Sequence, residues 1–358
     1  MSKYGHMQTA NLHRAPNLYH DLTYRRTSPR HAQLAAIIYL IVGFAFALMG
    51  ADKAHAQTTA AYPTKPIRLI IPFPAGGATD VLGRAISVRL GEKLGTSIVV
   101  DNKPGAGGTI GSDLAARAVA DGYTLLLATS STHSIAPTLN PKLNYDPDAD
   151  FTPIAHVANA PNVVLVPLSS PAKNVEQLVA LAKSKPGALN YASSGNGTVV
   201  HLQTELFKSM SGTYITHIPY RGTALAIPDL ISGKIDLLID SIPSALPHIH
   251  GGKVRALAVT SRQRTALMAD MPTVAETLKG YEAVTWFGLF APKQLSPELT
   301  ARINTAINDA LADPELKAQL NRLGAEAVGG TPQAFAAHYR REREQWKKVI
   351  AERKITAE

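Results

Sequence analysis

Cysteine is absent from the 358-residue chain, so no disulfide, zinc–thiolate centre or thiol nucleophile is possible. The absence of thiols fits a protein that works outside the reducing cytosol. Aromatic residues are only 6% of the chain and charged residues 18%, whereas hydrophobic residues reach 45%. These proportions are ordinary for a globular protein and provide for a sizeable core. Disorder is therefore not expected for most of the chain.

Signatures of phosphate binding are also missing. The glycine-rich segment KPGAGGTIGSD, residues 103–113, does not fit the pattern G-x-G-x-x-G from Gly105, because Ile110 stands at the last glycine position. No GK[ST] follows it. We interpret this segment as a structural turn before a helix.

Catalytic and metal-binding patterns are equally scarce. The chain has no G-x-S-x-G nucleophile elbow. His201 lies near Ser193 and Ser194, but nothing indicates an acid that would orient a Ser–His pair. His248 and His250 have no third ligand nearby. We therefore expect that the protein is not an enzyme and that it binds neither a cofactor nor a metal ion.

The N-terminal segment has no apolar run long enough for a typical membrane span. Residues 1–31 carry five basic residues and one acid, and Leu34–Met49 is an uncharged run of 16 residues, against roughly 20 for a span. Ala54 and Ala56 then place small residues at a cleavage site. This pattern predicts a signal peptide, residues 1–56, cleaved after Ala56, and a periplasmic protein. Cleavage removes six basic and two acidic residues, which lowers the net charge from +9 to +5. So mild an excess does not indicate nucleic-acid binding.

Short apolar runs alternate with helical periodicity from Pro66 onward. Ile67–Phe73, Ser97–Asn102 and Tyr123–Thr129 have the character of buried strands, and the segments between them predict helices. This βαβαβ order is typical of a doubly wound α/β sheet.

A second alternating unit begins near Asn159 and runs to about Gly280. No Gly/Ser linker separates it from the first unit, so we expect it to be inserted there. Lobe 1 would then comprise 57–157 and 284–358, and lobe 2 would comprise 158–283. Ligands of α/β proteins bind at the carboxyl ends of strands, here between the lobes.

Two glycine-containing loops have the same predicted setting. PFPAGGATD, residues 72–80, and SSGNGTVVHL, residues 193–202, each follow a strand and lead directly into a helix. A helix N-terminus offers free N–H groups and partial positive charge, and glycine allows a ligand close to the backbone. Both loops therefore predict an anion-binding backbone, although each could instead be a tight turn without a ligand.

The motifs together resemble a known receptor family. YPTKPIRLIIPFPAGGATDVLGRAI, VVDNKPGAGGTIGSDLAARAVADGYTLLLATSS, YASSGNGTVVHLQTELF, IPYRGTALAIPDLISGKIDLLID and VRALAVTS occur in order. They resemble the Bug-type extracytoplasmic solute receptors of tripartite tricarboxylate transporters, over nearly all of residues 62–358. The resemblance implies a type II periplasmic-binding-protein fold, with two α/β lobes, a hinge and an interlobe cleft.

The resemblance also implies the binding residues. A ligand carboxylate would lie between the two glycine-containing loops, held largely by backbone amides and ordered water. Carried over by position, the site residues are Phe73, Gly76, Gly77, Ala78, Thr79, Asp80, Ser130, Ser131, Thr132, Ser193, Ser194, Gly195, Asn196, Gly197, Thr198, Tyr220, Arg221, Gly222 and Asp240. Arg221 could equally form a surface ion pair, and Asp240 would suit a ligand ammonium.

The implied function is capture of a small organic carboxylate and its delivery to membrane permease subunits. The alternative is a periplasmic sensor that signals ligand occupancy to a membrane-bound two-component system. The expected partners are the carboxylate and, transiently, the transporter's membrane subunits, with no nucleic acid, and the protein is expected to be a monomer. The sequence does not indicate which carboxylate is bound.

Overall fold

The computed structural model describes residue 33 and residues 62–356. Apart from residue 33, the expected signal peptide and its cleavage site lie outside the described residues.

Ten strands of the described chain form one mixed sheet. They are β1 (Ile67–Ile71), β2 (Ile98–Asn102), β3 (Thr124–Thr129), β4 (Phe151–Pro167), β5 (Asn190–Ser193), β6 (Thr216–Pro219), β7 (Leu237–Ser241), β8 (Val254–Val259), β9 (Val284–Pro292) and β10 (Glu326–Ala327). The hydrogen-bonded order is β2-β1-β3-β9-β4-β7-β5-β6, and β8 and β10 also pair with β4. Strand β1 pairs in parallel with both β2 and β3, as the βαβαβ pattern predicts.

The helices lie between and around these strands. They are α2 (Ala78–Leu94), α3 (Thr109–Ala116), α4 (Ala136–Leu139), α5 (Val175–Ser184), α6 (Val199–Ser211), α7 (Thr223–Ile231), α8 (Ile242–His250), α9 (Val274–Thr277), α10 (Pro297–Ala312), α11 (Pro314–Arg322) and α12 (Pro332–Arg353). Three short helical turns are η2 (Ala106–Gly108), η3 (Ser131–Ile135) and η4 (Ala266–Met268). The first part of the glycine-rich segment 103–113 thus forms a turn that includes η2, as expected, and residues 109–113 already belong to α3.

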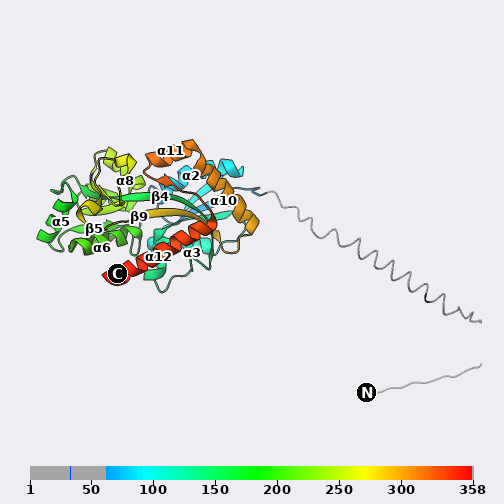
Figure 1. Ribbon diagram of the computed structural model, residues 1–358, viewed down its shortest axis with the longest axis horizontal. Coiled ribbons are helices and arrows are strands. Elements are labelled where there is room, and N and C mark those ends of the chain that lie inside the picture. Colours follow the sequence, from blue (N-terminus) through cyan, green and yellow to red (C-terminus); the bar gives the residue numbers. More distant parts are fainter. Residues whose placement is uncertain (1–32, 34–61, 357–358) are drawn as a thin grey trace, which may run out of the picture. The chain divides into compact units, whose positions relative to one another are not determined.

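Strand β4 connects two groups of strands. Its first part pairs with β9 as far as Pro161 opposite Val284, and from Asn162 onward it pairs with β7 and β8. Figure 1 shows β4 and β9 between the side that carries α5 and α6 and the side that carries α2 and α10. The change of partner, at Pro161 and Asn162, lies close to the expected lobe boundary at residues 157 and 158, and the division into lobes stays a prediction.

The first part of β4 was not predicted from the sequence. Pro153 and Pro161 interrupt this stretch, and proline normally argues against an interior strand because it cannot donate a ladder hydrogen bond. The register with β9 shifts directly after Pro153 and again between His156 and Ala158, and Pro161 stands at the last paired position, opposite Val284.

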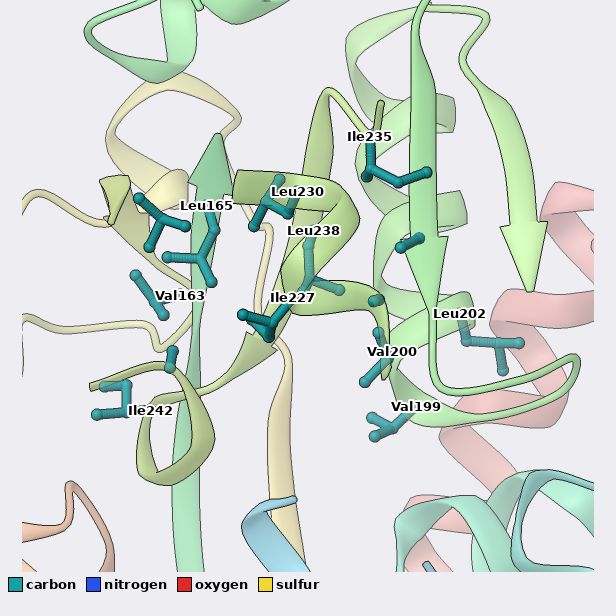
Figure 2. Close-up of a cluster of buried hydrophobic side chains, with 14 of the residues drawn as sticks. Val163, Leu165, Val199, Val200, Leu202, Ile227, Leu230, Ile235, Leu238 and Ile242 are labelled. Carbon is teal, nitrogen blue, oxygen red and sulfur yellow. The ribbon is translucent and has the colours of Figure 1, made fainter. Parts of the chain in front are cut away.

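Separate hydrophobic clusters stabilise the two groups of strands. Figure 2 shows one cluster, with Val163 and Leu165 from β4 lying among residues of α6, α7, β7 and α8. The other cluster includes Phe290 of β9 and Phe335 and Tyr339 of α12. Helix α12 reaches both clusters, because its Trp346 packs into the first.

Candidate functional site

The first glycine-containing loop connects β1 to α2. Gly76 has a φ of +81°, a left-handed conformation that favours glycine, and Gly77 is the N-cap residue with φ −77°. Gly77 has no side chain that could cap the helix. Within the part of the chain that the structure describes, no acceptor meets the N–H groups of Ala78 and Thr79 in the first turn. The start of α2 therefore has donors available to an anion.

The side chain of Asp80 stabilises this loop through hydrogen bonds. Its side chain is almost fully buried, and its carboxylate accepts hydrogen bonds from Gly76 N at 3.0 Å, Arg84 Nε at 2.9 Å and Asn102 Nδ2 at 3.0 Å. Asn102 Nδ2 also donates to the Phe73 carbonyl oxygen at 3.0 Å. Burial opposes ionisation of Asp80, but the hydrogen bonds from Arg84, Gly76 and Asn102 outweigh it and lower the pKa of Asp80. The amide of Gly76 is thus bound to Asp80.

The second glycine-containing loop, between β5 and α6, satisfies most of its own amides. Gly195 N donates to Ser193 Oγ at 3.1 Å, and Gly197 N donates to His201 Nδ1 at 3.2 Å. Thr198 caps α6 by accepting from His201 N, and Val199 N donates to Ser131 Oγ at 3.0 Å. The two loops therefore differ: at the start of α6 the amides of Val199 and His201 are bonded and that of Val200 has no acceptor among the described residues, whereas at the start of α2 neither Ala78 nor Thr79 has one.

A stack of three rings lies beneath the second loop. The rings of His201 and His217 have centroids 4.3 Å apart, and His217 stacks on Tyr191 at 4.7 Å. Ser193 Oγ lies 2.6 Å from His217 Nε2, so the serine that the sequence placed near His201 pairs with a different histidine. Burial lowers the pKa of His201 to about 4 and that of His217 to about 3, so both are neutral at physiological pH. Ser193 is fully buried and lies outside the pocket described next.

The start of α2 opens into a small buried pocket, with a free volume of about 40 Å³. Eight of the expected site residues line it: Phe73, Gly77, Ala78, Thr79, Ser131, Ser194, Gly222 and Asp240. Nine further lining residues were not expected: Pro74, Thr129, Val199, Val200, Thr223, Ala224, Ser241, Thr285 and Phe287. Seven of these lie within two residues of an expected site residue in the chain. Thr285 and Phe287 come from β9, whose approach to the pocket has no local sequence signal.

Other expected residues lie outside this pocket. Gly195, Asn196, Gly197, Tyr220 and Arg221 line a second, larger cavity of about 440 Å³, where Arg221 is exposed. Gly76, Asp80, Ser130, Thr132, Ser193 and Thr198 line neither cavity. Whether the residues of either set contact a ligand stays a prediction.

Ser130 and Thr132 form contacts within the protein. Ser130 Oγ donates to Glu342 Oε1 at 3.1 Å, and Thr132 Oγ1 donates to the Thr129 carbonyl oxygen at 3.2 Å. Ser131, between them, lines the pocket and accepts from Val199 N. Of the three adjacent residues, Ser131 alone is therefore in a position to face a ligand.

Asp240 is the penultimate residue of β7, lines the pocket and is 2% exposed. Its Oδ1 accepts from Ser241 N at 2.8 Å, and its Oδ2 accepts from Ser244 Oγ. Burial raises the pKa of Asp240 to about 6, although the hydrogen bonds from Ser244, Thr223 and Ser241 favour the ionised form. No salt bridge to Asp240 occurs among the described residues. The pocket thus holds a buried carboxyl group without a cationic partner.

Glycines bring the two expected lobes together beside the pocket. A Cβ atom at Gly222 would lie 2.6 Å from Pro74 Cγ, and one at Gly107 would lie 3.0 Å from the Asn196 carbonyl oxygen. Both distances are shorter than ordinary contacts. The chain approaches this closely because neither glycine has a side chain.

The described residues include neither a metal-ligand cluster nor a membrane-spanning helix. In residue 33 and residues 62–356, no three His, Cys, Asp or Glu side chains are grouped as metal ligands. None of the helices found there has both the length and the apolar character of a membrane span.

Comparison with known proteins identifies the family. The family described as "Tripartite tricarboxylate transporter family receptor" matches this chain over residues 82–355, which is more than half of its length. The chain belongs to this family. The resemblance stated from the sequence motifs is therefore confirmed, and a transporter receptor agrees with the expectation that the chain is not an enzyme.

Three relatives resemble this receptor over most of its length. It is 35% identical to BugT of Bordetella pertussis, covering 87% of this chain and 96% of that protein. It is 38% identical to Rpa4515 of R. palustris, solved with adipate, with a TM-score of 0.81 and coverage of 82% and 99% of the two chains. It is 32% identical to MatC of Rhodopseudomonas palustris, solved with bound malate, with a TM-score of 0.77 and coverage of 81% and 100%. These likenesses confirm the expected periplasmic-binding-protein fold.

Proposed function

We propose that this receptor captures a small organic carboxylate between two α/β lobes and delivers it to the membrane subunits of a tripartite transporter. The observation that carries the proposal is the start of α2, where the N–H groups of Ala78 and Thr79 open into a buried pocket. Backbone donors and the helix dipole stabilise an anion there without a cationic side chain. The relatives solved with adipate and with malate support a carboxylate as the ligand.

We propose that lobe 1 comprises residues 57–157 and 284–358 and that lobe 2 comprises residues 158–283, as inferred from the sequence. The change of partner along β4, at Pro161 and Asn162, supports a division close to the first of these boundaries. A hinge through β4 and β9 would open the contact between Gly222 and Pro74 and admit the ligand. Small-angle scattering with and without ligand tests this, because closure reduces the radius of gyration.

A thermal-shift screen tests the ligand class. The panel contains mono-, di- and tricarboxylates, amino acids and aromatic acids, with sugars and cationic peptides as controls. A ligand that binds only the folded state, at 100 times its Kd, stabilises by about 2.7 kcal/mol. At least one carboxylate should raise the melting temperature. Hits confined to sugars or cationic peptides would contradict the proposal.

We also propose export with cleavage after Ala56 and function as a monomer in the periplasm. The short uncharged run Leu34–Met49 and the small residues at 54 and 56 support this cleavage. The intact mass of protein recovered from the periplasm should correspond to a chain that begins at Gln57. Recovery of the full-length chain from the membrane fraction would contradict this proposal.

A further inference from the structure

Among the residues that the structure describes, Asp240 is the one ionisable side chain that lines the pocket at the start of α2. The other lining residues, among those the structure describes, are Gly, Ala, Pro, Val, Phe, Ser and Thr. Any charge in the pocket is therefore set by Asp240, by the dipole of α2 and by the ligand itself.

The elements packed against Asp240 provide hydrogen-bond donors but no cation. Ser241 N, Ser244 of α8 and Thr223 of α7 donate to the carboxyl group. The elements that pack against Asp240 are β4, β5, α6, α7 and α8. Their ionisable residues do not contribute to the shift in the pKa of Asp240; these are His156, Tyr191, His201, Glu205, Lys208, Asp229, His248 and His250. The burial that raises the pKa of Asp240 is thus not offset by a positive side chain.

A bound carboxylate would meet this acid at close range. The proposed ligand site, at Ala78 and Thr79, and Asp240 lie in the lining of one pocket of small volume. Two ionised carboxyl groups in such a buried space repel each other, and one pKa rises strongly when like charges share a site. A ligand ammonium would remove the repulsion, and so would a proton on Asp240.

We propose that Asp240 takes up a proton when the pocket binds a carboxylate that carries no positive charge of its own. The protonated carboxyl group then acts as a hydrogen-bond donor to the ligand. This inference rests on the proposed function, and it divides the ligands into two classes. Plain carboxylates bind with proton uptake, and amino acids bind without it because their ammonium group is paired with ionised Asp240.

Isothermal titration calorimetry measures this proton directly. The probe is the tightest-binding member of a panel of malonate, succinate, glutarate, adipate and benzoate, titrated at pH 7 in buffers of different ionisation enthalpy. The slope of the observed enthalpy against the buffer enthalpy gives the number of protons bound. We expect close to one proton per ligand, and a Kd that rises about tenfold between pH 7 and pH 8. Below about pH 6, the pH dependence should flatten, because free Asp240 is then already protonated.

Two variants assign the proton to Asp240. Asp240→Asn keeps the shape and removes the titrating group, so proton uptake and the rise in Kd above pH 7 should both disappear. Ser244→Ala keeps the acid but removes a hydrogen bond that favours its ionised form. Ser244→Ala should therefore raise the pH above which the Kd for the ligand begins to increase. Ser244→Ala also provides the test if Asp240→Asn does not fold.

The outcomes separate this inference from the proposed function. Binding of a panel member with no proton uptake, or with uptake that Asp240→Asn leaves unchanged, would overturn the inference while the carboxylate function stands. If Kd begins to rise at the same pH in Ser244→Ala as in the parent protein, the inference is also overturned. If no carboxylate binds in the panel or in the wider thermal-shift screen, the proposed function fails together with the inference.

Discussion

The backbone N–H of Gly76 donates a hydrogen bond to Asp80 Oδ2 at 3.0 Å, within the same loop. The sequence pattern predicted an anion-binding backbone in this loop and placed both Gly76 and Gly77 among the expected site residues. The bond to Asp80 leaves the donors of Ala78 and Thr79 for a ligand. Asp80 thus acts on the shape of the loop, and its negative charge is compensated by Arg84, outside the pocket lining.

Asp80→Asn should therefore weaken binding without removing a ligand contact. Asparagine cannot accept all the hydrogen bonds of the carboxylate, and Arg84 loses its ionic partner. We expect the free energy of unfolding to fall by about 1–3 kcal/mol, and the affinity for the best ligand to fall about tenfold as the loop loosens. Chemical denaturation and calorimetry measure the two effects.

Asp113→Asn is the matched control. Asp113 of α3 forms the same i,i+4 pair with Arg117, but its side chain is 26% exposed, against 6% for Asp80. Exposed pairs of this kind contribute less than about 1 kcal/mol, and Asp113 does not line the pocket. If Asp80→Asn and Asp113→Asn behave alike, Asp80 does not organise the loop.

Asp240 should destabilise the free protein above about pH 6. Its pKa rises from about 3.9 in an unfolded chain to about 6 in the folded protein. A raised carboxyl pKa means that folded-state stability is lost as pH rises from about 4 to about 6, and the loss is complete above that range. We expect ligand-free Asp240→Asn to be about 2–3 kcal/mol more stable than the parent at pH 7–8 and no more stable at pH 4. Urea unfolding at both pH values checks this prediction, and an equal change at both would contradict it.

Gly222→Ala should hinder closure of the cleft. Its Cβ atom would collide with Pro74, whose contact with Gly222 joins the two proposed lobes. We expect ligand affinity to fall at least about tenfold, and the radius of gyration with ligand to stay near the ligand-free value. Small-angle scattering and calorimetry measure both quantities.

Gly212→Ala separates closure from backbone strain. Gly212 also has a positive φ, +62°, but a Cβ atom there would meet nothing within 4 Å. Both substitutions strain the backbone, and Gly222→Ala alone blocks the contact. Equal affinities in the two variants would mean that this contact has no part in closure.

Local sequence patterns were enough to predict much of the fold. Alternating apolar runs placed β1, β2 and β3 with the helices between them, and the glycine-containing loops were correctly placed before α2 and α6. The motif set also indicated the family correctly. These features depend on residues that are close together in the chain.

Features that depend on distant residues were not accessible from the sequence. Val199 N donates to Ser131 Oγ from 68 residues away, which is why the start of α6 is less available than that of α2. Asn102 joins the Asp80 network from a separate strand. The first part of β4 contains two prolines that argue against a strand until its shifted register with β9 is known. Each of these required the tertiary structure.

The central claim is that the start of α2 binds the ligand carboxylate, and Gly77 tests it most directly. Gly77 has an ordinary φ of −77°, and a Cβ atom there would meet only the Pro74 carbonyl oxygen, at 3.5 Å. Asparagine and aspartate are both favourable N-cap residues, so Gly77→Asn and Gly77→Asp should both fold. They have nearly the same shape and differ by one negative charge.

Calorimetry with the best ligand of the screen should separate the two variants. Two like charges about 4 Å apart, at an effective dielectric constant near 20, repel by roughly 4 kcal/mol. We therefore expect Gly77→Asp to bind about a thousandfold more weakly than Gly77→Asn. If the two folded variants bind with the same affinity, the carboxylate is not held at the start of α2, and the account is wrong.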